Sequence, residues 1–194
     1  MTLEHSLSID FTEAPTAAVN LENAGRILNA AVEILKQGED LLGSLSAEDY
    51  ARRLPVAFNA CIGGHYRHCL DHFISLLRSI GTDEVDYDHR DRDPRIESQP
   101  QIARTITHEI RTELQRHPLE SLESRVRVRS EVSYAHGDSP EMNSTFGREL
   151  AYCIAHAIHH FALISVMARL MEIPLHPTFG VAPSTVIHQR AQKG

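Results

Sequence analysis

Hydrophobic residues recur at three- and four-residue steps in four stretches of the chain, the spacing that places them on one face of an α-helix. The stretches run from about Val19 to Gly43, from about Pro55 to Ser79, from Ile102 to Arg116, and from Ser144 or Thr145 through Met171. The capping residue of the last helix stays open between Ser144 and Thr145. Four amphipathic helices of this length predict an all-α fold with one shared core.

Particular residues support the ends of these helices. Pro55 suits the first turn of the second helix and Gly81 its C-terminal cap. Phe58 begins the apolar line of that helix and Ile80 ends it. A short helical turn is also predicted from Ser46 to Asp49, because a serine followed by acidic residues is typical of a helix N-terminus.

The connecting segments differ in pattern. Residues 82–100 mix acidic and basic residues, which predicts a solvated loop, although His89, Arg90 and Arg92 could reach over a pocket as a lid. Residues 119–143 contain the alternating run Arg125–Val132, which predicts a small β-hairpin or irregular insertion before the last helix, with a turn at His136–Pro140.

The whole chain, residues 1–194, is predicted to form a single domain. Residues 1–17 show no sustained period, and we expect them to form an N-terminal arm on the body. Residues 175–194 are too apolar and proline-rich for a free terminus, so we expect this C-terminal tail to pack on the body or on a partner subunit.

Composition excludes several function classes. A net charge of −7 argues against a non-specific nucleic-acid binder, which needs a basic face. No apolar run approaches the ~20 residues needed to span a bilayer, and the N-terminus has no signal-peptide pattern, so we expect no membrane partner. Three cysteines, an odd number, favour reduced thiols and a cytoplasmic location.

Histidine is the unusual residue of this composition. Of the 13 histidines, His65, His68 and His72 fall in the second predicted helix and His156, His159 and His160 in the fourth. The first three lie within about 60° of one another around a helix axis. His156 and His160 are one helical turn apart, the spacing that lets two imidazoles bind one Zn²⁺ or Ni²⁺, whereas His159 points about 60° away from His156 and borders the pocket.

Several alternatives remain open at this level. His156 and His160 could be a hydrogen-bonded core pair with Glu149 or Asp71 as partner, because buried imidazoles need partners. If one histidine of the second helix joins them, the result is a three-histidine site with an open position, but helical geometry cannot choose among His65, His68 and His72. Asp71 would then accept a hydrogen bond from a ligating imidazole. Cys69 and Cys153 are alternative ligands or small buried apolar residues.

Gly63 and Gly64 interrupt the second predicted helix. Each costs roughly 1 kcal/mol of helix stability relative to alanine, so their presence needs a reason. A close contact with a neighbouring helix is one explanation, and room for a ligand beside His65 is the other. The sequence favours neither.

Two of these motifs together resemble a known family. Ile62-Gly-Gly-His-Tyr-Arg-His-Cys-Leu-Asp71, followed by His156-Ala-Ile-His-His160, resembles the DinB-like (YfiT-like) superfamily of metal-binding four-helix proteins over about residues 19–172. The resemblance implies an up-down-down-up bundle, frequent homodimers, and a divalent metal on His68, His156 and His160. Family members include thiol-dependent S-transferases and a mycothiol-dependent isomerase. This chain departs from the pattern in having His65, His72, the Arg125–Arg129 run and the C-terminal tail.

The hypothesis that follows is a metal-dependent enzyme. Zn²⁺ or Ni²⁺ on His68, His156 and His160 would activate a water or a thiol at its open position. His65, His72 or His159 would move protons or line the pocket. The expected partner is a small-molecule substrate, with a low-molecular-weight thiol as one form, and the expected reaction is S-transfer or hydrolysis. The alternative is a non-catalytic metal- or ligand-binding protein related to stress.

Overall fold

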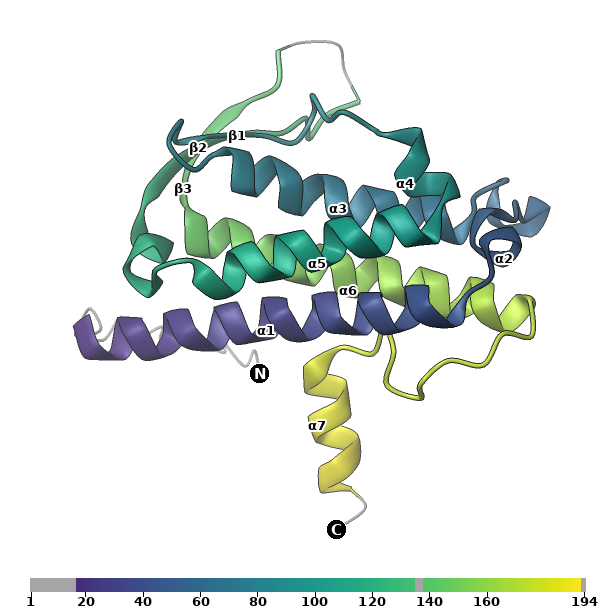
Figure 1. Cartoon of the computed structure of the whole chain (residues 1–194). Helices are drawn as coiled ribbons and strands as arrows, with labels where there is room; N and C mark the ends of the chain where they lie inside the picture. The colour runs from purple at the N-terminus through teal and green to yellow at the C-terminus, as the bar shows by residue number, and fades with distance from the viewer. Residues whose placement is uncertain (1–16, 135–137, 193–194) are drawn as a thin grey trace, which may run out of the picture.

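The computed structural model describes residues 17–134 and 138–192 and shows a mostly helical protein with a small three-stranded sheet (Figure 1). The long helices are α1 (Ala17–Ser44), α3 (Ile62–Arg78), α5 (Pro100–Arg116) and α6 (Phe146–Leu170). The short ones are α2 (Ala47–Ala51), α4 (Pro94–Ser98) and α7 (Pro183–Ala191), with 3₁₀ turns at Pro55–Ala57 and Leu119–Glu123. The strands are β1 (Glu84–Asp86), β2 (Arg125–Arg129) and β3 (Glu141–Thr145).

The four long helices follow the hydrophobic periodicity of the sequence. α1 packs against α5 and α6, and α3 packs against α6 and α5. Their buried side chains form one core, which includes Leu76 of α3, Leu114 of α5 and Ile164 of α6. The expected helical fold class is therefore confirmed.

Side-chain caps fix where several helices begin. Thr145 caps α6 by accepting a hydrogen bond from the backbone N–H of Arg148 at 3.2 Å, which decides between the two expected candidates. Ser46 caps α2 in the same way through Asp49 N–H at 3.0 Å. α5 begins at Pro100, slightly before the predicted start at Ile102, and ends before His117, as predicted.

The predicted start of α3 at Pro55 is wrong. Pro55–Ala57 forms a separate 3₁₀ turn, and Phe58 and Asn59 then adopt left-handed backbone conformations with φ of 55° and 59°. A helix cannot continue through two such residues. α3 instead begins after Cys61, and Phe58, expected in the core, is 99% exposed. Ile80, at the other end of the expected apolar line, is also exposed.

The insertion before α6 is the predicted β-hairpin, extended by a third strand. β2 pairs antiparallel with β3, so that Val126 lies opposite Ser144, and β1 pairs parallel with β2, so that Val85 lies opposite Val128. The expectation that residues 82–100 form only a solvated loop is wrong, because this segment contains β1 and α4. A three-residue strand is too short for alternation to reveal it.

The first part of the tail, from Leu175 to Phe179, packs on the body. Phe179 is buried and its ring stacks on Phe161 of α6, with centroids 4.8 Å apart. Beyond it, α7 has no buried residue among those described and projects from the body (Figure 1). The expected arm at residues 1–17 lies almost wholly outside the described residues, and the expected turn at His136–Pro140 lies partly outside them.

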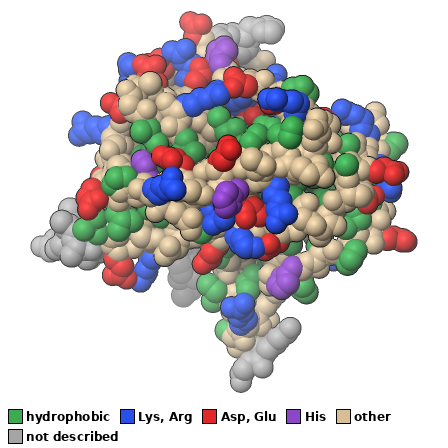
Figure 2. All heavy atoms as spheres, viewed as in Figure 1, with side chains coloured by type: hydrophobic (Ala, Val, Ile, Leu, Met, Phe, Trp, Pro, Cys, Tyr) green, Lys and Arg blue, Asp and Glu red, His purple; other side chains and the backbone are tan. Residues whose placement is uncertain are grey.

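α6 is long and apolar enough, by length and composition alone, to cross a membrane. The sequence-level expectation that no stretch approaches this criterion is therefore wrong. Core helices of soluble proteins meet the same criterion, and α6 supplies Leu150, Phe161 and Ile164 to the shared core. On the face shown in Figure 2, acidic and basic side chains are interspersed with apolar ones.

Candidate metal centre

Two helices bring the histidine clusters together. α3 carries His65, His68 and His72, and α6 carries His156, His159 and His160. Cys61 caps α3, its Sγ accepting a hydrogen bond from Gly64 N–H at 3.3 Å, so the helical spacing of the first three histidines begins just after this cap. Because α3 packs along α6, the two clusters face each other.

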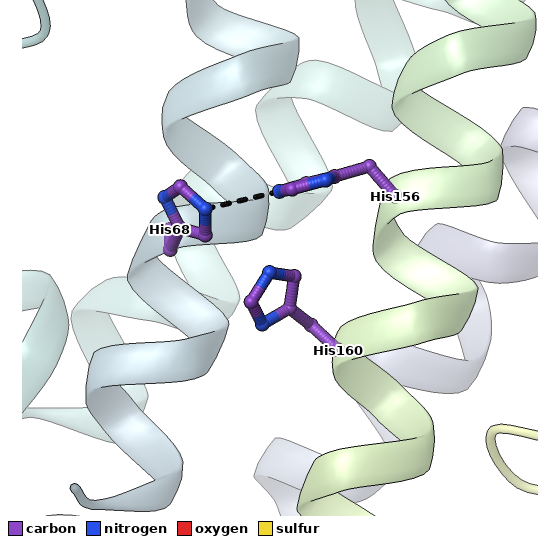
Figure 3. A group of neighbouring side chains, drawn as sticks. All are labelled: His68, His156 and His160. Carbon is purple, nitrogen blue, oxygen red and sulfur yellow. Dashed lines mark hydrogen bonds between the residues drawn. The ribbon is translucent and has the colours of Figure 1, made fainter. Parts of the chain in front are cut away.

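His68, His156 and His160 form the centre of the assembly. One nitrogen from each lies within 4.8 Å of the other two. The Nε2 atoms of His68 and His156 are 3.0 Å apart, and the His160 ring points into the same space from the next turn of α6 (Figure 3). A tetrahedral ion with metal–nitrogen distances of about 2.0–2.1 Å holds its nitrogens roughly 3.4 Å apart, so small ring movements would suffice to bind one.

His65 contacts the outer nitrogen of His160. The two Nδ1 atoms are 3.0 Å apart, so one ring donates a hydrogen bond to the other. This contact leaves the Nε2 of His160 for a metal and holds the ring in place. His65 is therefore in contact with the triad but does not belong to it.

His72 is the most buried of the six histidines and has a fixed tautomer. Its Nδ1 donates a hydrogen bond to the backbone carbonyl of His68 at 2.9 Å, because a carbonyl oxygen can only accept. Its Nε2 therefore keeps a lone pair when the ring is neutral. The ring lies against His156, with centroids 4.1 Å apart, and stacks on Tyr87 at 5.1 Å.

Burial keeps these imidazoles uncharged. Desolvation, followed by repulsion from neighbouring histidines, lowers the pKa of His68 to about 2 and the pKa values of His156 and His160 to about 4. Desolvation also lowers the pKa of His72 to about 4 and that of His65 by a smaller amount. Neutral imidazoles with available lone pairs are the form that binds a metal, so the donor set fits a divalent ion.

These shifts predict acid sensitivity of the metal-free protein. The pKa of His72 is about 4 in the folded chain against 6.5 in the unfolded chain, so the unfolded state binds more protons between these pH values. The free energy of unfolding should therefore fall as the pH decreases from 6.5 to 4. Chemical denaturation in chelator should show that His72→Gln reduces this fall by roughly 1–2 kcal/mol, allowing for solvent screening.

His159→Gln is the matched control for this measurement, because His159 is the neighbour of His160 on α6 but its side chain is exposed. The control should retain the full dependence on pH. An unchanged pH dependence in His72→Gln would contradict the assignment.

The two expected carboxylate partners are engaged elsewhere. Asp71 is buried and accepts a hydrogen bond from Arg67 at 2.8 Å rather than from an imidazole. Glu149 accepts hydrogen bonds from Tyr87 OH at 3.0 Å and from Ser144 Oγ at 2.6 Å. Glu149 therefore reaches the histidines only through Tyr87, whose ring stacks on His72.

Cys69 and Cys153 are buried free thiols. Desolvation raises the pKa of each thiol, that of Cys153 to about 12, which disfavours the thiolate form needed for metal binding. Neither belongs to the three-histidine group. They act as small buried apolar residues, the second of the two expected roles.

Arg90 is the one member of the expected lid that reaches the triad. Its Nη1 lies 2.7 Å from Nδ1 of His68, while His89 bonds to Asp86 and Arg92 is exposed. Since arginine only donates, His68 Nδ1 accepts, and the proton of the neutral ring lies on Nε2, facing His156. If His68 binds a metal through Nε2, its ring proton must move to Nδ1. Nδ1 can then no longer accept a hydrogen bond, so Arg90 must give up this contact.

Tyr87 and Tyr152 were missed at the sequence level. Their rings lie 5.4 Å apart and stack on His72 and His156, at centroid distances of 5.1 and 5.7 Å. Tyr152 stands one turn before His156 on α6, so its spacing could have revealed it. Tyr87 follows a three-residue strand and gave no periodic signal. Both residues also line a cavity of about 400 Å³ between the sheet and α6.

Comparison with known proteins adds one partial similarity. No protein-family model matches the chain. A segment of the chain is similar to FK506-binding protein 5 of Rhizopus delemar, at 31% identity over 108 residues. The aligned part covers 56% of this chain and 28% of that protein. The chain thus spans little more than a quarter of this relative, and the match assigns it to no family.

Proposed function

We propose that this chain is a divalent-metal protein of the DinB-like kind, with Zn²⁺ or Ni²⁺ held by His68, His156 and His160. The observation that carries the proposal is the convergence of three neutral imidazoles from two helices, with ligand atoms within 4.8 Å of one another. Buried imidazole nitrogens need binding partners, and the present partners of the triad are other histidines and Arg90. A metal meets that requirement.

The helix contacts support the finer architecture that belongs to this proposal. We propose that α1, α3, α5 and α6 form an up-down-down-up four-helix bundle, since each contacts two of the others. A homodimer is the proposed assembly, because Leu163, Val166 and Leu170 leave an apolar face of α6 exposed.

A metal-dependent enzyme acting on a small molecule is the proposed activity. A bound divalent ion supplies Lewis acidity, lowering the pKa of a water or thiol in its free position. His65 positions His160 through the contact between their Nδ1 atoms. His72 is the candidate base, because its Nδ1 proton is fixed on the His68 carbonyl and its Nε2 can accept a proton. His159, exposed beside His160, lies at the rim.

The adjacent cavity favours an enzyme over a non-catalytic binding protein. Tyr87 and Tyr152 line it and also stack on His72 and His156. Its volume of about 400 Å³ is within the range of small-molecule sites. S-transfer with a low-molecular-weight thiol is the proposed reaction form, and hydrolysis is the second form of the same chemistry.

Metal content tests the metal claim. After expression with added Zn²⁺ or Ni²⁺ and purification without a histidine tag, mass spectrometry should find close to one equivalent of metal per chain. Less than about a tenth of an equivalent would overturn the claim.

Thiol consumption tests the enzyme claim. The loaded protein should accelerate depletion of a low-molecular-weight thiol by a generic electrophile, and His72→Gln should lower the rate while retaining the metal. A rate equal to that of the metal-stripped protein would favour the alternative, a non-catalytic metal- or ligand-binding protein.

A further inference from the structure

We infer that the cavity between the sheet and α6 binds a small organic anion with an apolar body, and that Arg148 holds its carboxylate at the mouth. The inference rests on the proposed function, because it names the substrate class of that site.

The inner part of the cavity is largely apolar. It is lined by Val128 of β2, Met142 of β3, Tyr87 and Tyr152. Val128 and Tyr87 are buried, whereas Met142 is 44% exposed and stands nearer to solvent. An apolar ligand body placed here would end against the two tyrosine rings, which themselves contact the histidine cluster.

The polar group at the inner end of the cavity would repel an anion. Glu149 is 8% exposed, and its two oxygens accept hydrogen bonds from Tyr87 and Ser144. Among the described residues, this carboxylate forms no ion pair, although Arg148 lines the same cavity. A ligand carboxylate is therefore disfavoured at this end, and the apolar end of the ligand should enter first.

One cation lines the cavity, Arg148, whose side chain is exposed and therefore stands at the mouth. Arg148 lines the cavity and also a neighbouring hollow that Arg125, Asn143 and Thr145 complete. Arg127 and Arg129 on the same strand pair with Glu84 and Glu141. Among the described residues, Arg148 has no carboxylate partner, so its guanidinium group can bind an anion at the mouth.

Two naphthalene compounds of the same shape test this arrangement. Isothermal titration of the full chain should show that 2-naphthoate binds more tightly than the neutral 2-naphthamide. Arg148→Met should weaken naphthoate binding about 10-fold and leave naphthamide binding unchanged. Arg169→Met, which removes an exposed arginine at the far end of α6, is the matched control and should change neither.

A second variant keeps the test independent of Arg148. Met142→Glu places a carboxylate at an exposed position of the cavity wall, and it should weaken naphthoate binding more than naphthamide binding. Equal affinities of the two compounds, or equal losses of both in Arg148→Met and Met142→Glu, would overturn the inference.

The titrations are run on zinc-loaded and on chelator-treated protein. The cavity is complete without a metal, so naphthoate should bind in both states. If the protein fails to bind zinc but still binds naphthoate in a way that depends on Arg148, the result counts against the metal centre alone. If the protein binds zinc but its affinity for naphthoate does not depend on Arg148, the result counts against this inference alone.

Discussion

Replacing His160 by alanine is expected to lower the affinity for Zn²⁺ or Ni²⁺ by at least about 100-fold, as measured by titration calorimetry of the chelator-treated protein. The loss follows from the geometry. His160 supplies one of three ligand nitrogens, and its ring is aimed at the space between His68 and His156 (Figure 3). Two remaining imidazoles cannot replace it, because His65 lies on the opposite side of the His160 ring.

His159→Ala is the matched control for this substitution. His159 is the neighbouring residue on α6, but its side chain is exposed and lies outside the triad. We expect its affinity for the metal to remain within about threefold of that of the unaltered chain, since the three ligands are intact. Equal losses in the two variants would show that the wrong pair of α6 histidines has been assigned.

His65→Ala should fall between these two results. It removes the contact that holds the His160 ring but leaves all three ligands, and loss of such an outer contact typically costs 10- to 100-fold in metal affinity. Circular dichroism of each variant would establish that the helices remain folded.

Gly63→Ala is expected to lower the free energy of unfolding by about 3 kcal/mol or more. A Cβ at this position would lie 1.9 Å from the backbone carbonyl oxygen of Glu97 and 2.8 Å from the ring of Tyr50. Neither contact can be relieved by a flexible side chain, because the carbonyl belongs to α4 and Tyr50 is fully buried. α3 and α4 would have to move apart.

Gly64→Ala is the control, at the next residue of the same helix. Its Cβ would meet Cys61 Sγ at 3.5 Å and the carboxylate of Glu97 at 3.8 Å, which are ordinary contacts. Alanine is the better helix former, so this variant should be unchanged or stabilised by up to about 1 kcal/mol in urea denaturation. Equal destabilisation of both variants would contradict the contact assigned to Gly63.

The same contact explains Gly63, but not Gly64, whose Cβ would meet only ordinary contacts. Gly63 is required by the close approach of α4, and this is the helix-contact explanation. Room for a ligand beside His65 is not needed to account for it. A sequence cannot separate these explanations, because the approaching backbone belongs to residues more than thirty positions away.

The amino-acid sequence by itself determined the local features of this protein. The periodicity of Ile102, Ile106, Ile110 and Leu114 predicts α5, and its proline and His117-Pro118 boundaries match the structure. The alternation of Arg125–Arg129 predicts β2. The helical spacing of the two histidine clusters is likewise local. Such patterns are readable because side-chain direction depends only on the backbone repeat of one element.

Local signals were insufficient at the start of α3. The apolar spacing around Phe58 fits a helix, yet Phe58 and Asn59 take left-handed conformations and the helix begins four residues later than the apolar line. The Cys61 cap and the packing of Gly63 on α4 hold that start. Tertiary contacts therefore overrode the periodic pattern here.

The tertiary structure alone decided which side chains meet. Helical geometry placed His65, His68 and His72 on one face without ranking them, whereas the packing of α3 on α6 brings His68 to His156 and His65 to the outer nitrogen of His160. Arg90 and Tyr87 reach the histidines because β1 joins the hairpin and directs the following loop across α3. The angle and offset at which two elements pack depend on all their contacts together, so no single stretch of sequence encodes them.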